Sequence, residues 1–271
     1  MKRLSCLSFA LSCCSYLMAQ NTEALVKAER DFEESCLETG IRDGFLAHVD
    51  SNGIVFTDKG PVNAKKFWMA LPVFEGVFTW SPSFVEMSTD ADWGYTTGNY
   101  EHRPHSLKDT VEDSGQYTTV WHKIENGQWK YLIDIGNRHT HQTLDEPAKS
   151  IDQEKYGAGN NSREDFLLDQ ENTFIQLFEK SINEAYRANA SSRYILNITS
   201  RLPVLSYDSS ISILSKVPSL HYMPVGFKIS PANDLAAVYG TFSQSGKEGN
   251  YLRIWRHEKN GWKIALEVIR I

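Results

Sequence analysis

A pattern of two strands joined by a tight turn occurs twice in the chain, and this repeat constrains the fold more than any other feature. The first copy covers residues 115–136 (GQYTTVWHKIENGQWKYLIDIG) and the second covers residues 250–269 (NYLRIWRHEKNGWKIALEVI). In each copy an Asn-Gly pair separates segments rich in aromatic and β-branched residues, which indicates a β-hairpin. Self-similarity over this length predicts a duplicated domain. The matched residues are Tyr117 and Tyr251, Trp121 and Trp255, Trp129 and Trp262, Asp134 and Glu267.

Each hairpin is preceded by a long amphipathic helix. Residues 22–39 and residues 165–187 carry apolar side chains at spacings of three and four, with charges between them. Strand-like segments lie between each helix and its hairpin. Helices followed by a run of antiparallel strands predict the α+β fold class. The two helices also begin alike, with Leu25, Glu29 and Phe32 in the first and Leu167, Glu171 and Phe174 in the second.

The segment between the two halves has the composition of a linker. Residues 142–164 contain proline, glycine and asparagine and show no periodic apolar pattern. A chain of 271 residues is long enough for two domains of ordinary size. We therefore expect one domain over residues 21–141 and a second, divergent domain over residues 165–271.

Residues 1–20 have the order of a secretory signal peptide. Positive charge at residues 2–3 precedes an uncharged apolar run, and polar residues begin at Asn21. Neither this run nor any other segment is long enough for a comfortable membrane span, so we expect none. A secreted or periplasmic protein is the expectation. Lipid attachment at Cys13 or Cys14 is the less favoured alternative, because the residues before them fit a lipobox poorly.

The segment from Ala24 to Asn137, and above all its hairpin, resembles the domain of unknown function 4440 in the nuclear transport factor 2-like superfamily. It is also similar to the SnoaL-like family. The second half keeps the hairpin and the first helix but departs between Ala188 and Ala232. The resemblance implies two tandem cone-shaped domains, each a curved antiparallel sheet wrapped around a long N-terminal helix and often holding a pocket. It further implies pairing through the outer sheet faces, so we expect an intramolecular pseudo-dimer of the two halves.

The turns decide which hairpin side chains share a face of the sheet. In the second copy, a two-residue Asn-Gly turn would pair Lys259 with Trp262, so that Trp255 and Trp262 lie on one face. The first copy has one more residue between its tryptophans, which then share a face if Gly127 is left-handed in a three-residue turn. The helix-covered face would carry Tyr117, Thr119, Trp121, Trp129, Tyr131, Ile133 and Ile135. The outer face would carry Val120, His122, Lys130, Leu132 and Asp134.

Three aromatic residues of the first hairpin are the candidate ligand-binding residues: Tyr117, Trp121 and Tyr131. They could line a pocket in which the hydroxyl groups orient a small ligand. Equally, they could fill the core and leave no pocket. Asp134 is a further candidate, because a carboxylate inside an apolar enclosure would have a raised pKa. The face assignment places it outside instead, whereas a two-residue turn would put it on the same face as Trp121.

Composition and motifs exclude several classes of function. A formal net charge of −6 and the lack of a basic cluster argue against nucleic acid. The spacings His102-x-x-His105 and His139-x-His141 bring no third ligand, so we expect no metal site. No motif for a cofactor, a catalytic Ser or a catalytic Cys is present, so we expect no cofactor and assign no catalytic residue.

These observations favour a secreted tandem protein that binds a small molecule or a protein partner without catalysis. The alternative is an enzyme that uses the same kind of pocket. It would be an isomerase, a dehydratase or a hydrolase-like enzyme in which a buried Asp or His acts with tyrosine in proton transfer. Fold alone does not choose between the two.

Overall fold

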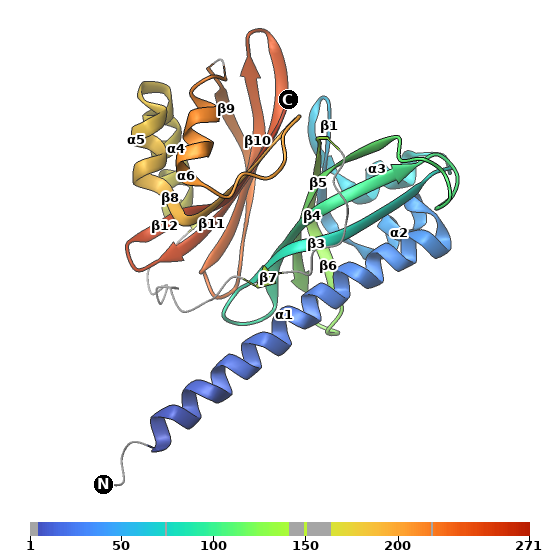
Figure 1. Cartoon of the computed structure of the whole chain (residues 1–271), viewed down its shortest axis with the longest axis horizontal. Coiled ribbons are helices and arrows are strands. Elements are labelled where there is room, and N and C mark those ends of the chain that lie inside the picture. Colours follow the sequence, from blue (N-terminus) through green and yellow to red (C-terminus); the bar gives the residue numbers. More distant parts are fainter. Residues whose placement is uncertain (1–4, 74, 141–148, 151–163, 218) are drawn as a thin grey trace.

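The computed structural model describes residues 5–73, 75–140, 149–150, 164–217 and 219–271. Within these residues the fold is mixed α+β, with two sheets and six helices. Figure 1 shows the sheets adjacent to each other in the middle of the molecule, with helices on the outer side of each.

The first half forms a seven-stranded sheet in the order β2-β1-β6-β5-β4-β3-β7. Neighbouring strands are antiparallel except for β1 with β6 and β3 with β7. The elements are α1 (Ser5–Thr39), α2 (Ile41–His48), β1 (Val49–Thr57), β2 (Gly60–Asn63), α3 (Ala64–Ala70), β3 (Val77–Met87), β4 (Trp93–Arg103), β5 (Asp113–Lys123), β6 (Trp129–Arg138) and β7 (Lys149–Ser150).

The second half forms a five-stranded sheet in the order β8-β12-β11-β10-β9, with β8 parallel to β12. Two helices, a strand, a helix and a run of antiparallel strands follow one another, and the first half has the same order except that β2 is added between β1 and α3 and β7 follows β6. The elements are α4 (Glu164–Lys180), α5 (Ile182–Asn189), β8 (Ala190–Ile198), α6 (Tyr207–Leu214), β9 (His221–Ile229), β10 (Leu235–Gln244), β11 (Lys247–Glu258) and β12 (Gly261–Arg270).

Most of the expected linker, residues 142–164, lies outside the described residues. Within it, Lys149–Ser150 forms β7 beside β3, and α4 begins at Glu164. At the other end of the first half, α1 is one helix that includes both the expected leader from Ser5 onward and the expected helix. Among the helices described, none is long and apolar enough to cross a membrane.

The two hairpin turns differ, as the spacing of their tryptophans predicts. In the first, the Ile124 amide donates to the Gln128 carbonyl oxygen at 2.9 Å, and Gly127 has a φ of 85°. This is the expected three-residue turn with a left-handed glycine. In the second, Glu258 pairs with Gly261, so the expected pairing of Lys259 with Trp262 is wrong. Trp255 and Trp262 nevertheless belong to the same buried cluster.

A bulge in β6 overturns the expected faces of that strand. Val120 pairs with Ile133 and Trp121 pairs with Tyr131, so Leu132 is an extra residue that reverses the alternation of side chains. Asp134 therefore pairs with Thr119 and faces the helix side, contrary to the outer position expected for it. Ile133 and Ile135 lie on the outer side instead, and β12 has the same bulge at Ala265.

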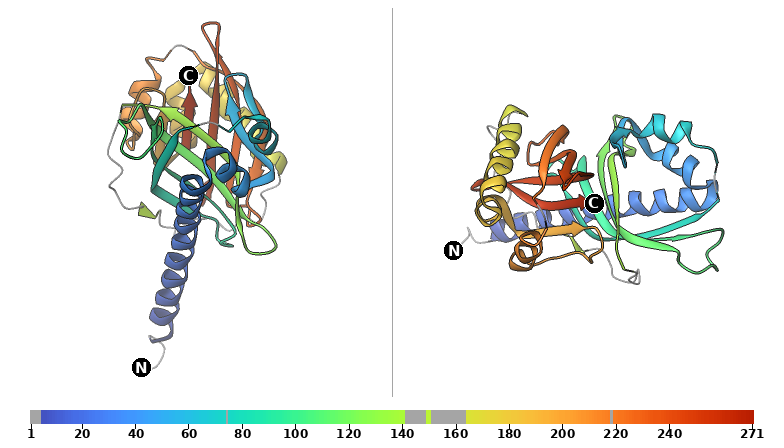
Figure 2. Two further views of the ribbon diagram at one scale, coloured as in Figure 1. Left: turned by 90° about the vertical axis from the view of Figure 1, so that its right-hand side faces the viewer. Right: turned by 90° about the horizontal axis from the view of Figure 1, so that it is seen from above.

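The two sheets lie next to each other (Figures 1 and 2), and their outer faces share one apolar cluster. This arrangement is compatible with the expected pairing of the halves. The cluster draws on both sheets, with Val120, Leu132, Ile133 and Ile135 from the first and Leu252, Ile254, Ala265, Leu266 and Val268 from the second among its members.

The charged residues Arg256 and Lys130 do not pair with Asp134 or Glu267 of the opposite half. Arg256 makes a buried ion pair with Glu86 of β3, through two nitrogens, rather than with Asp134. Lys130 donates to the Ala47 carbonyl oxygen within its own half. The bulge accounts for this difference, because it turns Asp134 away from the second sheet.

Candidate functional site

A pocket of about 610 Å³ lies in the first half, between α1, α2 and α3 and the inner face of the sheet. We call it the first-half pocket. Its size is within the range of small-molecule sites. Its lining includes Glu29, Phe32, Trp80, Tyr117, Thr119, Asp134 and Gly136 from the first half and Thr199 and Arg270 from the second.

Glu29 is a fully buried carboxyl group at the wall formed by α1. It lies one turn from Leu25 and Phe32, on the stripe of α1 that packs against the sheet. Its Oε1 accepts a hydrogen bond from the Trp80 indole at 2.6 Å, and its Oε2 accepts one from Trp121 at 2.9 Å and one from the Thr96 hydroxyl at 2.5 Å. Burial nevertheless raises the pKa of Glu29 to about 7.

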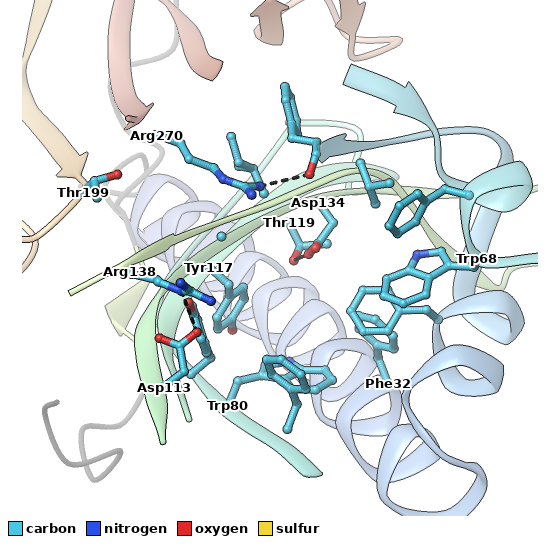
Figure 3. Close-up of a pocket in the computed structure, with 18 of the residues that line it drawn as sticks. Phe32, Trp68, Trp80, Asp113, Tyr117, Thr119, Asp134, Arg138, Thr199 and Arg270 are labelled. Carbon is cyan, nitrogen blue, oxygen red and sulfur yellow. Dashed lines mark hydrogen bonds and ion pairs between the residues drawn. The ribbon is translucent and has the colours of Figure 1, made fainter. Parts of the chain in front are cut away.

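Asp134 is the second carboxyl group of the pocket, and the Thr119 side chain is its hydrogen-bond partner. The Thr119 hydroxyl donates to Asp134 at 2.8 Å. Burial raises the pKa of Asp134 to about 6, against the lowering effects of that hydrogen bond and of Arg270. In Figure 3, Asp134 lies between the arginines of the rim and the rings of Phe32 and Trp68.

The rim of the pocket is charged, and both halves contribute to it. Arg138 pairs with Asp113 at 2.8 Å within the first half (Figure 3). Arg270 reaches across from β12, donating to the Phe56 carbonyl oxygen at 3.0 Å and approaching Asp58 at 3.4 Å. Each rim carboxylate thus has its own arginine, whereas no arginine or lysine among the described residues forms a hydrogen bond or ion pair with either interior carboxyl group.

The structure separates the three candidate ligand-binding residues. Tyr117 lines the pocket, and its hydroxyl has no hydrogen-bond partner among the described residues. Trp121 and Tyr131 are fully buried beside Phe32, with ring centroids 5.8 and 5.7 Å from it, and they are not part of the lining. Trp121 contributes to the pocket indirectly, because its indole nitrogen donates a hydrogen bond to Glu29.

Glu29 and Trp80 are pocket residues that sequence analysis did not select. Glu29 gave a signal, because a charged residue recurs at the same place in the apolar stripes of both long helices. Trp80 gave none. Of the histidine pairs, His141 lies outside the described residues, and no cluster of three metal-ligating side chains occurs in the part of the chain that is described.

The corresponding space in the second half is occupied by the chain itself. Arg253 is fully buried and pairs with both Glu171 and Glu267, the latter at 2.8 Å. It corresponds to Thr119, because each pairs across the hairpin with the acidic residue of the last strand. By the same registers Ile269, fully buried, stands where the first half has Gly136.

The two interior carboxyl groups predict stability that falls as the pH rises. Their raised pKa values mean that the folded state holds more protons than the unfolded chain between about pH 4 and pH 7, so the free energy of unfolding decreases through that window. We expect this decrease to be smaller in Asp134→Asn and in Glu29→Gln, measured by urea unfolding at pH 5 and pH 8. Identical pH dependence in the wild type and both variants would contradict the prediction.

Comparison with known proteins finds similar solved structures for segments the length of one half. A nuclear transport factor 2-like protein from Cytophaga hutchinsonii is 18% identical, with 41% of this chain and 98% of that chain covered and a TM-score of 0.35. A second such protein, from Shewanella oneidensis, is 16% identical over 42% and 97% of the chains, with a TM-score of 0.35. A ketosteroid isomerase-like protein from Erwinia carotovora atroseptica is 13% identical over 42% and 94%, with a TM-score of 0.32.

Two of the three are named as nuclear transport factor 2-like proteins, and none of the three names refers to the domain of unknown function 4440. At such identities the likeness is one of fold. No protein-family model matches the chain, and no curated protein matches it.

Proposed function

We propose that the chain binds a small molecule in the first-half pocket. The observation that carries this proposal is Asp134, a carboxyl group that faces a cavity of about 610 Å³ and has one hydrogen bond from the chain. An ionised carboxylate accepts up to about four hydrogen bonds, and leaving that capacity unused in a buried place is costly. A bound ligand would supply further hydrogen bonds to Asp134.

We propose that the two duplicated domains have different roles. The first domain, residues 21–141, bends its sheet around α1 as a cone and holds the ligand. The second, residues 165–271, supports the first domain through the shared apolar cluster and supplies Arg270 and Thr199 to the rim.

Gly136 allows the proposal to be tested without disturbing the carboxyl groups. A Cβ atom at Gly136 would lie 3.5 Å from the Tyr100 ring, an ordinary contact, so a larger side chain is tolerated there and occupies the pocket. We expect Gly136→Ile, which copies the second half, to abolish small-molecule binding, and Gly136→Ala to retain it. The measurement is native mass spectrometry of the protein purified from its source. Retention of a co-purified small molecule by Gly136→Ile would refute the pocket as its site.

Proton-transfer catalysis is a second candidate, favoured by one observation. Asp134 has a pKa of about 6 and lies in the same pocket as Tyr117, so it could take up or release a proton near neutral pH. Incubation of the co-purified molecule with fresh wild-type protein and with Asp134→Asn distinguishes this from simple binding. A product that forms only with the wild type would favour catalysis, and an unchanged molecule would favour binding.

We also propose that residues 1–20 are a secretory leader and are absent from a secreted or periplasmic mature protein. The charge, the apolar run and the small residues before Asn21 support this. N-terminal sequencing of exported protein that starts at Met1 would refute it.

A further inference from the structure

The two halves place charged side chains of the same kind around the same point, with one exception. The matching carboxyl groups are Glu29 and Glu171 on the long helices, and Asp134 and Glu267 on the last strands. The exception is Thr119, which stands where the second half has Arg253. The second half therefore encloses a cation between two carboxylates, and the first half has the carboxyl groups without the cation.

Three aromatic rings surround Arg253 in the second half. Its guanidinium carbon lies 4.3 Å from the ring centroid of Phe174, 4.0 Å from that of Tyr222 and 4.7 Å from that of Tyr251. Rings at such distances attract a planar cation through their negative faces. The first half has aromatic residues at all three matching positions, and all three line the pocket: Phe32, Trp80 and Tyr117.

The match of Trp80 with Tyr222 comes from the strand registers. Trp80 pairs with Tyr100 and Tyr222 pairs with Phe242, and in both strands a proline follows two residues later, next to a bulge. The pairing partners Tyr100 and Phe242 occupy equal places in the following strand, because each lies two residues beyond a matching glycine. The aromatic enclosure is therefore common to both halves and does not depend on Arg253 being present.

The first half also differs in the residues next to the carboxyl group of its last strand, Asp134. In the second half Glu267 accepts hydrogen bonds from Tyr186 at 2.5 Å, Tyr194 at 2.8 Å and Tyr222 at 3.3 Å, in addition to Arg253. The matching positions in the first half carry Phe45, Gly53 and Trp80. Asp134 therefore faces open space at the place where Glu267 meets donors of the chain.

We propose that the first-half pocket binds an organic cation, whose planar guanidinium or amidinium head takes the place that Arg253 occupies in the second half. This inference rests on the proposed function and names its ligand class. Asp134 supplies the main counter-charge, because Glu29 already accepts three hydrogen bonds. The rings of Phe32, Trp80 and Tyr117 enclose the head. The remaining volume of the pocket accommodates the body of the ligand, beneath a rim whose own charges are paired.

Methylguanidine and methylurea provide a matched pair of probes, because they have nearly the same shape and only the first is a cation at neutral pH. We expect the full chain to bind methylguanidinium at least about 10-fold more tightly than methylurea, by calorimetry at pH 8. Asp134→Asn should remove this preference. Asp169→Asn, at an exposed position on α4, is the matched control and should retain it.

Thr119→Arg tests the same site from within the chain. The new side chain copies Arg253, so it should fill the pocket, abolish binding of methylguanidinium and raise the unfolding temperature. Thr173→Arg makes the same substitution at an exposed helix position and should change neither property. If Thr119→Arg bound methylguanidinium as tightly as the wild type, the inference would be wrong.

Arg253→Gly applies the reverse test to the second half. Removing the side chain leaves Glu171 and Glu267 without their cation, and methylguanidinium at millimolar concentration should restore stability where methylurea does not. If the variant does not fold alone, its refolding yield with each probe is the measurement. Equal yields with the two probes would count against the correspondence of the two sites.

The outcomes separate this inference from the proposed function. Equal affinity for the two probes, or binding of neutral compounds only, overturns the cation class and leaves small-molecule binding standing. If no small molecule co-purifies with the chain and neither probe binds, both are overturned. Preferential binding of methylguanidinium that is lost in Asp134→Asn supports both.

Discussion

Arg253→Met should lower the free energy of unfolding by about 3 to 5 kcal/mol, the usual cost of removing one partner from a buried ion pair. Arg253 is fully buried, as are the two carboxylates it bridges, Glu171 and Glu267. Methionine fills much of the arginine volume but leaves both acidic groups without a counter-charge. Urea or guanidinium chloride unfolding of the full chain measures the loss.

Two sets of variants test the cause of that loss. Arg138→Met removes an exposed arginine from a surface pair and should cost less than about 1 kcal/mol. Adding Glu171→Gln and Glu267→Gln to Arg253→Met should recover part of the loss, because the uncompensated charges are then gone. If Arg253→Met lowered the free energy of unfolding by less than about 1 kcal/mol, the buried ion pairs would not be needed for stability. The interpretation of Arg253 as a structural cation of the second half would then be wrong.

Trp262→Ala should have an effect of similar size, about 3 to 5 kcal/mol, because it deletes a buried large aromatic side chain. Trp262 is 2% exposed and belongs to the core of the second half. Its repeat counterpart Trp129 is only partly buried, and the Lys123 amine lies 4.9 Å from its ring.

We expect the two tryptophan substitutions to lower the free energy of unfolding by different amounts. The equal position of Trp129 and Trp262 after their turns suggests equal costs, but the structure predicts a loss below about 2 kcal/mol for Trp129→Ala, since half-buried side chains remove less apolar surface from water. Equal losses in chemical denaturation would contradict the burial difference between the two halves.

The pocket illustrates how a duplication can separate roles. Both halves have a similar helix pattern and hairpin, and the second fills its interior with Arg253 and Ile269. The first has Thr119 and Gly136 at those places, and both of these smaller residues line the pocket. Arg270 connects the roles, because a residue of the closed half contributes to the rim of the open pocket.

The sequence by itself determined the features that depend on local patterns. The repeat predicted two halves with a similar order of elements, and the apolar spacing predicted a helix over residues 22–39. The single helix expected over residues 165–187 is instead two helices, α4 and α5, which are separated at Ser181. The extra residue between Trp121 and Trp129 allowed a three-residue turn with a left-handed Gly127, and the structure has that turn. Such features follow from the period of side chains along one segment and from turn geometry, so neighbouring residues are enough to specify them.

Only the tertiary structure decided which side chains meet in the pocket. The bulges at Leu132 and Ala265 have no local signature, because each extra residue is an ordinary apolar residue in an apolar strand. One extra residue turns every later side chain to the opposite face, and that moved Asp134 from the outer surface to the interior. The pairing of a helix carboxyl group with distant strands, and the reach of Arg270 across the halves, likewise depend on packing between segments far apart in the chain.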